Sequence, residues 1–173
     1  MSNYGISVGV LKYGKPYLGA IYVPATKEVV YFDGKKAHWL QNAFRENQQK
    51  SEIAKRDANP TAFSASSDIL VIANKKYNSE HIDLGLYSSI VHFLYLATNR
   101  LRGHYCAAYP WDIAGAWATF KHLGIEAINI ETGEVLEEIS DKTFSQNWKL
   151  KVPHVFCRPS DFEHYQSLAL KAA

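Results

Sequence analysis

One stretch, from Tyr109 to Gly124, constrains the fold of this chain more than any other. It reads Tyr-Pro-Trp-Asp-Ile-Ala-Gly-Ala-Trp-Ala-Thr-Phe-Lys-His-Leu-Gly. Pro110 cannot continue a preceding strand and suits the approach to a helix, a mostly apolar run follows it, and Gly124 can end that helix as the residue after its last turn. We therefore predict a helix that ends at Leu123, with Asp112 as its N-cap.

The aspartate at the start of this helix has two interpretations. Helix starts present unpaired N–H groups and a partial positive charge, which keep a carboxylate ionised and restrain its side chain. Such a carboxylate suits Mg²⁺, which prefers hard oxygen ligands and shares its coordination shell with water and substrate phosphate. Alternatively, Asp112 only caps the helix behind a buried Trp111, because aspartate is common at helix starts.

Composition sets the broad class. The chain has 173 residues, 47% of them hydrophobic, which is enough for a real core. Its net charge of +2 comes from scattered lysines and arginines, so we expect no nucleic-acid partner. No apolar run reaches the roughly 18 residues that span a bilayer, and the first residues do not form a signal peptide, so we expect a cytoplasmic protein without membrane contact.

Cysteine and histidine usage gives no metal motif. Cys106 and Cys157 lack the spacing of a zinc site or a redox pair, so we expect two buried free thiols. The seven histidines do not pair at the spacing of a zinc helix, and we expect no zinc.

The N-terminal third predicts an antiparallel meander. Strands rich in β-branched and aromatic residues run over Ile6–Leu11, Tyr17–Val23, Glu28–Asp33 and Ala37–Gln41. The polar stretch Asn42–Ala65 predicts a surface connection. A sheet built in this way exposes an edge or a face that normally has a neighbour.

The rest of the chain predicts a mixed α/β arrangement. A buried strand is expected over Ile69–Ala73, and Phe144 and Trp148 are expected to anchor a polar loop by burial. We predict two sub-domains, a meander with its connection over residues 1–60 and an α/β unit over residues 61–173. The further elements expected in the second unit are a short helix from 78, a helix over 86–100, strands over 103–108, 125–130 and 152–156, and a last helix over 158–170.

Four segments in order resemble the inositol monophosphatase family. Residues 110–116, Pro-Trp-Asp-Ile-Ala-Gly-Ala, resemble its second signature, which is usually Trp-Asp-x-Ala-Ala/Gly-Gly. Residues 120–125 resemble its passage from helix through glycine to strand, residues 132–136 a later hairpin, and residues 8–24 the hairpin after its first metal motif. The resemblance implies a layered α+β sugar phosphatase fold of the α/β class. It also implies a Mg²⁺-dependent phosphomonoesterase in which Asp112 binds a metal ion and a substrate hydroxyl.

The sequence departs from the family in two places. The family carries most metal ligands ahead of the first hairpin, in a Glu-bearing helix region and an Asp-Pro-x-Asp-Gly-Thr loop. This chain contains neither, so it resembles the C-terminal two-thirds of such a phosphatase, truncated at the N-terminus. Its one Asp-Gly pair, Asp33-Gly34, predicts a hairpin turn. A family glutamate that contacts substrate is also missing, because Tyr105 or Cys106 stands in its place.

Two serines occupy a family substrate position. Ser88 and Ser89 stand where the family has a helix start whose backbone N–H groups hold the sugar-like substrate, although the family's glycine is replaced by Tyr87. Alternatively, these serines only cap a helix.

Two functions remain open from the sequence. The first is a phosphatase for a phosphorylated inositol, a related sugar phosphate or a nucleotide phosphate, inactive or incomplete as this chain alone. The second is a non-catalytic remnant that acts as an oligomerisation or interaction module. In either case we expect a homodimer, or pairing with a missing N-terminal segment.

Overall fold

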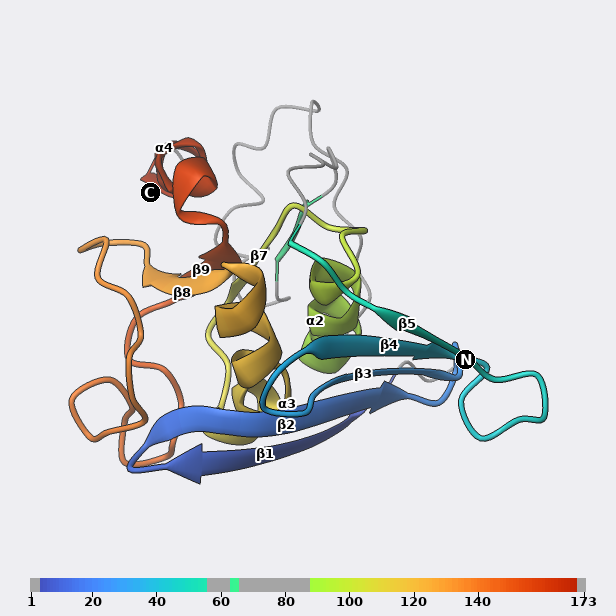
Figure 1. Ribbon diagram of the computed structural model, residues 1–173. Coiled ribbons are helices and arrows are strands. Elements are labelled where there is room, and N and C mark those ends of the chain that lie inside the picture. The colour runs from blue at the N-terminus through green and yellow to red at the C-terminus, as the bar shows by residue number, and fades with distance from the viewer. Residues whose placement is uncertain (1–3, 56–62, 66–87, 171–173) are drawn as a thin grey trace.

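The computed structural model describes residues 4–55, 63–65 and 88–170, and it arranges them in layers (Figure 1). A five-stranded sheet forms one side, two helices lie behind it, and a four-stranded sheet with a last helix follows. This arrangement confirms the layered α+β fold predicted from the resemblance. The predicted boundary at residue 60 lies outside the described residues and stays a prediction, as do the strand expected over 69–73 and the short helix from 78.

The first sheet is an antiparallel meander of consecutive strands. Its strands are β1 (Ile6–Lys12), β2 (Lys15–Val23), β3 (Glu28–Phe32), β4 (Ala37–Gln41) and β5 (Gln49–Glu52), and they pair in that order. The first four strands match the prediction. The fifth corrects it, because part of the expected surface connection pairs with β4. All four side chains of β5 are exposed, so it lacks the apolar alternation that marks a half-buried strand.

The turn between β3 and β4 is a hairpin turn, as predicted. Gly34 has a φ of 94°, a conformation that glycine adopts without strain. The Asp33 carboxylate accepts hydrogen bonds from the backbone N–H groups of Lys35 and Lys36 at 2.9 and 2.8 Å, and its other oxygen lies 2.8 Å from His38 Nε2. These hydrogen bonds to the ionised carboxylate lower the pKa of Asp33.

The second sheet is mixed. Its strands are β6 (Phe63–Ala65), β7 (Gly103–Cys106), β8 (Glu126–Asn129) and β9 (His154–Cys157), in the order β6-β7-β9-β8. Among the described strands of this sheet, β6 and β7 pair in parallel, and β9 pairs antiparallel with both β7 and β8. All residues of β7 and β9 are buried, because helices pack on one face of the sheet and α4 (Phe162–Leu170), entered through a short 3₁₀ turn, packs on the other.

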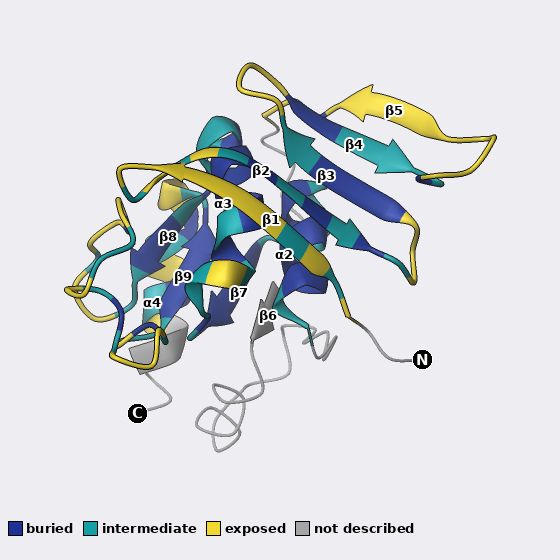
Figure 2. Cartoon of the chain, turned by 90° about the horizontal axis from the view of Figure 1, so that it is seen from below, coloured by how far each residue is buried: buried dark blue, intermediate teal, exposed yellow. Residues whose placement is uncertain are grey.

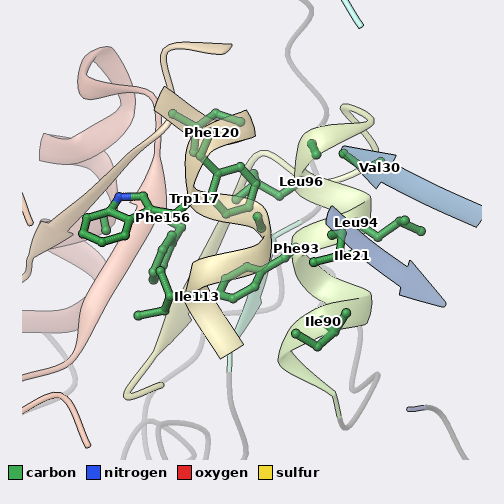
Figure 3. Packing of buried hydrophobic residues seen from close by; sticks show 14 of the residues in the cluster. Ile21, Val30, Ile90, Phe93, Leu94, Leu96, Ile113, Trp117, Phe120 and Phe156 are labelled. Atoms are coloured by element: carbon green, nitrogen blue, oxygen red, sulfur yellow. The ribbon is translucent and has the colours of Figure 1, made fainter. Parts of the chain in front are cut away.

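One hydrophobic core joins the two sheets through the helices α2 (Ser89–Ala97) and α3 (Pro110–Leu123) (Figure 3). The ring of Phe93 in α2 meets Phe120 of α3 edge-on at 5.3 Å and Phe156 of β9 at 4.9 Å between centroids. Trp117 of α3 and Ile21 of β2 belong to the same buried cluster. The helices are therefore fixed from both sides.

Three glycines bring α3 into contact with the backbone of β1 and β2. A Cβ atom at Gly9 would lie 2.5 Å from the Ala114 Cβ, and one at Gly19 would lie 2.5 Å from the Gly115 carbonyl oxygen. Gly115 itself faces the Ser7 hydroxyl, which accepts a hydrogen bond from the Gly115 N–H at 3.1 Å. Any side chain at these positions would push the helix away from the sheet.

Burial was predicted for two large aromatic residues, and the prediction is correct for one of them. Phe144 is buried, as predicted for an anchor of the loop before β9, whereas Trp148 is 55% exposed and the prediction for it is wrong. Cys106 and Cys157 are both buried free thiols, as expected. Among the described residues, every helix is too short or too polar to cross a bilayer.

Replacing Gly115 with alanine tests the contact between α3 and β1. In an open helix, Gly→Ala would stabilise the protein by about 1 kcal/mol, because alanine has the higher helix propensity. Here the new Cβ would lie 2.5 Å from Ser7 Oγ and 2.6 Å from the Ala20 carbonyl oxygen. We expect Gly115→Ala to lower the free energy of unfolding in urea by about 1–3 kcal/mol. A gain in stability would contradict the close contact.

The buried His154 predicts a pH dependence of stability. Burial in β9 lowers its pKa from the ordinary value of 6.5, while the hydrogen bond to the Val152 carbonyl raises it. The unfolded chain therefore binds a proton below pH 6.5 that the folded chain does not yet bind, so stability is full above pH 6.5 and falls below it. We expect His154→Asn to reduce the slope of unfolding free energy between pH 6.5 and 5 by up to ~1.4 kcal/mol per pH unit. An unchanged slope in urea titrations at several pH values would contradict this.

Candidate metal and substrate site

The N-cap of helix α3 lies three residues before the predicted one. Its N-cap is Tyr109, with an extended backbone at φ −95° and ψ 158°, and Asp112 is the third residue of the helix rather than the N-cap. The reason is Pro110, whose missing N–H and fixed φ suit the first helical position. The helix ends as predicted, with Gly124 in the left-handed conformation at φ 73°.

The Asp112 carboxylate has one oxygen engaged and one open. Its Oδ2 accepts a hydrogen bond from the Tyr109 N–H at 3.2 Å, which restrains the side chain. Its Oδ1 has no hydrogen-bond or ion-pair partner among the described residues. Half-burial raises the pKa of this carboxyl, and the Tyr109 hydrogen bond lowers it. A cation bound at Oδ1 would favour the ionised form of this carboxyl.

The neighbours of Asp112 are aromatic and apolar. Trp111 is 56% exposed, which corrects the alternative of a buried tryptophan, and its ring stacks on Tyr109 with centroids 4.7 Å apart. Tyr105 and Cys106 are both buried, and neither offers the carboxylate that the family has at this point. Burial, with a smaller effect of the Asp112 charge, raises the pKa of the Cys106 thiol, so it is not an activated nucleophile.

Ser88 and Ser89 form the start of α2. Ser88 is its N-cap, with extended backbone, and Ser89 is its first residue; both are half-buried. The Ser88 side chain makes no capping hydrogen bond, although its carbonyl accepts from the Val91 and His92 N–H groups at 3.1 and 3.2 Å. The helix ends three residues before the predicted end at Arg100, and Leu86 and Tyr87, at its predicted start, lie outside the described residues. Substrate binding by the two serines remains a prediction.

Both helices start beneath β1, the edge strand of the first sheet. Gly5 faces Ile90 in the first turn of α2, and Gly9 faces Ala114 near the start of α3. Gly5 and Gly9 are four positions apart, which is about 13 Å along an extended chain. The positive ends of two helix dipoles are therefore gathered near one sheet edge, a favourable place for an anion such as phosphate.

The residues present fit one ligand of a hard cation, not a complete shell. Within residues 4–55, 63–65 and 88–170, no three His, Cys, Asp or Glu side chains come together as a metal site. Asp112 Oδ1 is an open, restrained carboxylate oxygen of the kind that Mg²⁺ takes.

Sequence reasoning missed Ser7, which ties β1 to α3 through the Gly115 N–H. A signal for it exists in the alternation Gly5-x-Ser7-x-Gly9. Small residues at every second strand position form one face, and such a face can be approached closely by another element.

Comparison with known proteins links the chain to one family. The model of the inositol monophosphatase family matches residues 1–155. A comparison with curated proteins finds no match.

Solved structures of this family share the fold at low sequence identity. The Thermotoga maritima IMPase has a TM-score of 0.66 and 17% identity, over 97% of this chain and 61% of its own. CysQ from Bacteroides thetaiotaomicron, a bacterial member of the inositol monophosphatase family, has a TM-score of 0.65 and 15% identity, over 90% of this chain and 62% of its own. An IMPase/NADP phosphatase complexed with Mg²⁺ and phosphate has a TM-score of 0.65 and 14% identity, over 91% of this chain and 56% of its own. The chain thus spans about three-fifths of the length of these proteins.

Proposed function

This chain belongs to the inositol monophosphatase family, and from that membership we propose that it forms part of a Mg²⁺-dependent phosphomonoesterase in which Asp112 binds one metal ion. The family and the fold are those of phosphatases. The observation that carries the proposal is the open Oδ1 of Asp112, held at a helix start while its Oδ2 accepts the Tyr109 N–H.

The chemistry follows from general rules for metal-assisted phosphate hydrolysis. Bound Mg²⁺ would neutralise charge on the phosphoryl oxygens and lower the pKa of an attacking water. The Tyr109 N–H would hold the Asp112 carboxylate in place as a ligand of that ion. The N-terminal N–H groups of α2, at Ser88 and Ser89, would hold hydroxyl or phosphate oxygens of the substrate.

The proposed substrate is a phosphorylated inositol or a related sugar or nucleotide phosphate. One structural neighbour is described as bound to D-inositol-1-phosphate and as dual specific for inositol and NADP phosphates, so the fold accepts more than one substrate class. The family glutamate that contacts a substrate hydroxyl is replaced by Tyr105 or Cys106, which disfavours inositol in particular.

One carboxylate cannot hold a catalytic metal centre, so further carboxylates must come from outside the described residues. The first sheet offers a place for them. Ser7 and Gly9 of β1 face the helices, as does Gly5 just before the strand. The alternate residues Ile6, Val8 and Val10 are 50, 60 and 48% exposed, and Figure 2 shows β1 as a largely exposed strand. An apolar outward face and a free strand edge together are typical of a surface that another segment covers.

We propose that this surface, formed by the edge and outer face of β1, takes the polypeptide that completes the fold. The relatives are longer than this chain by about two-fifths of their length, which is enough for such a layer. A strand added to the edge of β1 would lie about 4.8 Å beyond it. Because Gly9 of β1 touches Ala114, two residues after Asp112, that strand could bring carboxylates to the start of α3.

The alternative is a non-catalytic interaction module. It is favoured by the same uncovered face and by the lack of a metal cluster within the described residues. In that case the chain would bind its partner through β1 without forming a metal site.

Hydrolysis assays separate the two functions. We expect the chain alone to release little phosphate from inositol phosphate with Mg²⁺, and activity to appear when a polypeptide covering the N-terminal part of the Thermotoga maritima relative is added. Asp112→Asn should then reduce the rate about 100-fold or more, because it removes a charged metal ligand. Asp141→Asn, in an exposed loop, is the matched control. No activity with the added segment, although it binds, would favour the non-catalytic module.

The docking surface is tested by the mass of the complex. We expect a 1:1 complex between the chain and the added segment in light scattering, and we expect Val8→Asp to weaken it at least tenfold, by burying an unpaired charge. Tyr13→Asp is the control, because Tyr13 is 89% exposed at the hairpin tip between β1 and β2. A dimer of the chain itself that excludes the segment would contradict the proposed occupant.

A further inference from the structure

A pocket of about 110 Å³ lies at the opposite ends of the two central helices from Asp112. It is lined by the last residues of α2 and α3, by Trp39 and Ser51 on neighbouring strands β4 and β5, and by Lys55 and Arg158. Eleven residues of α3 separate Asp112 from Leu123, which is roughly 16 Å along the helix. The pocket is therefore separate from the site proposed above and does not depend on it.

One wall of the pocket is a fixed aromatic ring. The Trp39 Nε1–H donates a hydrogen bond to Glu28 Oε1 at 2.9 Å, and the Arg100 guanidinium lies 5.4 Å from the Trp39 ring centroid. Glu28 is buried and also pairs with Arg100 at 3.1 Å. Buried Leu123 and Ile125 also line the pocket, so a ring-sized apolar group could rest between apolar surfaces.

Two cationic side chains at this pocket are not neutralised by a carboxylate. Lys55 and Arg158 have no acidic partner within 4.0 Å among the described residues, and Arg158 donates only to the neutral Asn99 Oδ1, at 3.2 Å. Glu52 also lines the pocket, but its charge is already paired, with its Oε2 2.6 Å from Lys36 Nζ.

The negative ends of the two helices offset only part of this positive charge. The C-termini of α2 and α3 each carry roughly half a negative charge, which together offset about one of the two cations. Carbonyls near both ends already accept hydrogen bonds: the Leu96 oxygen from the Asn99 N–H at 3.1 Å and the Phe120 oxygen from the Ile125 N–H at 2.9 Å. About one positive charge is thus left over at the pocket.

From this arrangement we propose that the pocket binds a small organic monoanion, with a flat apolar body against Trp39 and its anionic group between Lys55 and Arg158. A closed cavity of about 150 Å³ holds a whole benzene ring, so this open pocket of about 110 Å³ would take part of such a ring and leave the rest at its mouth. A planar carboxylate fits both the charge and the shape. An inorganic phosphate matches the charge but leaves the apolar walls unused.

A nuclear magnetic resonance titration with benzoate tests the proposal. We expect saturable shifts at Trp39 and around the pocket, with a Kd of about 1 mM or below. Benzamide, the neutral analogue, should bind at least fivefold more weakly, because a hydrogen bond to a charged group contributes more than a neutral one. Inorganic phosphate should also bind more weakly than benzoate.

Two variants with the same change in net charge distinguish binding in the pocket from a general electrostatic effect on binding. Lys55→Gln should weaken benzoate binding at least fivefold, and Lys35→Gln, on the exposed turn between β3 and β4, should leave it unchanged. Equal losses in both variants, equal binding of benzoate and benzamide, or no saturable binding would each overturn the proposal. In those cases Lys55 and Arg158 serve only as counter-charges to the helix ends.

Discussion

The backbone contact between α3 and the strands β1 and β2 is the constraint on which the other features depend. It is possible only because Gly9, Gly19 and Gly115 leave no side chains between the helix and the sheet. Ser7 then fixes the register through its hydrogen bond to the Gly115 N–H. The start of α3, and with it Asp112, is thereby held beside β1, which pairs with no strand other than β2 among the described residues.

The helix layer held by this contact has a positive side and a negative side. Both central helices begin beneath β1 and end near β4 and β5, so their positive ends gather at one side and their negative ends at the other. Asp112 lies at the positive side, where a phosphate would also be favoured. Lys55 and Arg158 lie at the negative side and exceed the charge of the helix ends. Two different kinds of ligand are therefore suited to the two ends of one helix layer.

Sequence patterns predicted the parts of the fold that depend on local periodicity. The alternation in β1 to β4, the Asp33-Gly34 turn and the helix that ends at Gly124 are all read from neighbouring residues. Strand β5 was missed because an exposed polar edge strand has no apolar face. The cap at Tyr109 was missed because aspartate suits both the N-cap and the third helical position, and Pro110 decides between them.

Burial of single aromatic residues depends on long-range packing, which a local pattern does not contain. Phe144 and Trp148 lie in one loop, yet one is buried and the other exposed, and Trp111 is exposed although it lies in the first turn of a largely buried helix. For the site, the sequence singled out Asp112 but not its open Oδ1 or the role of Ser7. The Ser7 contact joins residues 108 positions apart, and the bonding of Asp112 depends on the helix starting at Pro110 rather than after Asp112.

The most direct test of the account is to locate the metal. Crystals of this chain in complex with the added segment, grown with Mn²⁺ in place of Mg²⁺, would show the ion by anomalous scattering. The account predicts an ion about 2.1 Å from Asp112 Oδ1, with Oδ2 still bonded to the Tyr109 N–H. A bound ion whose ligands do not include Asp112 would contradict it.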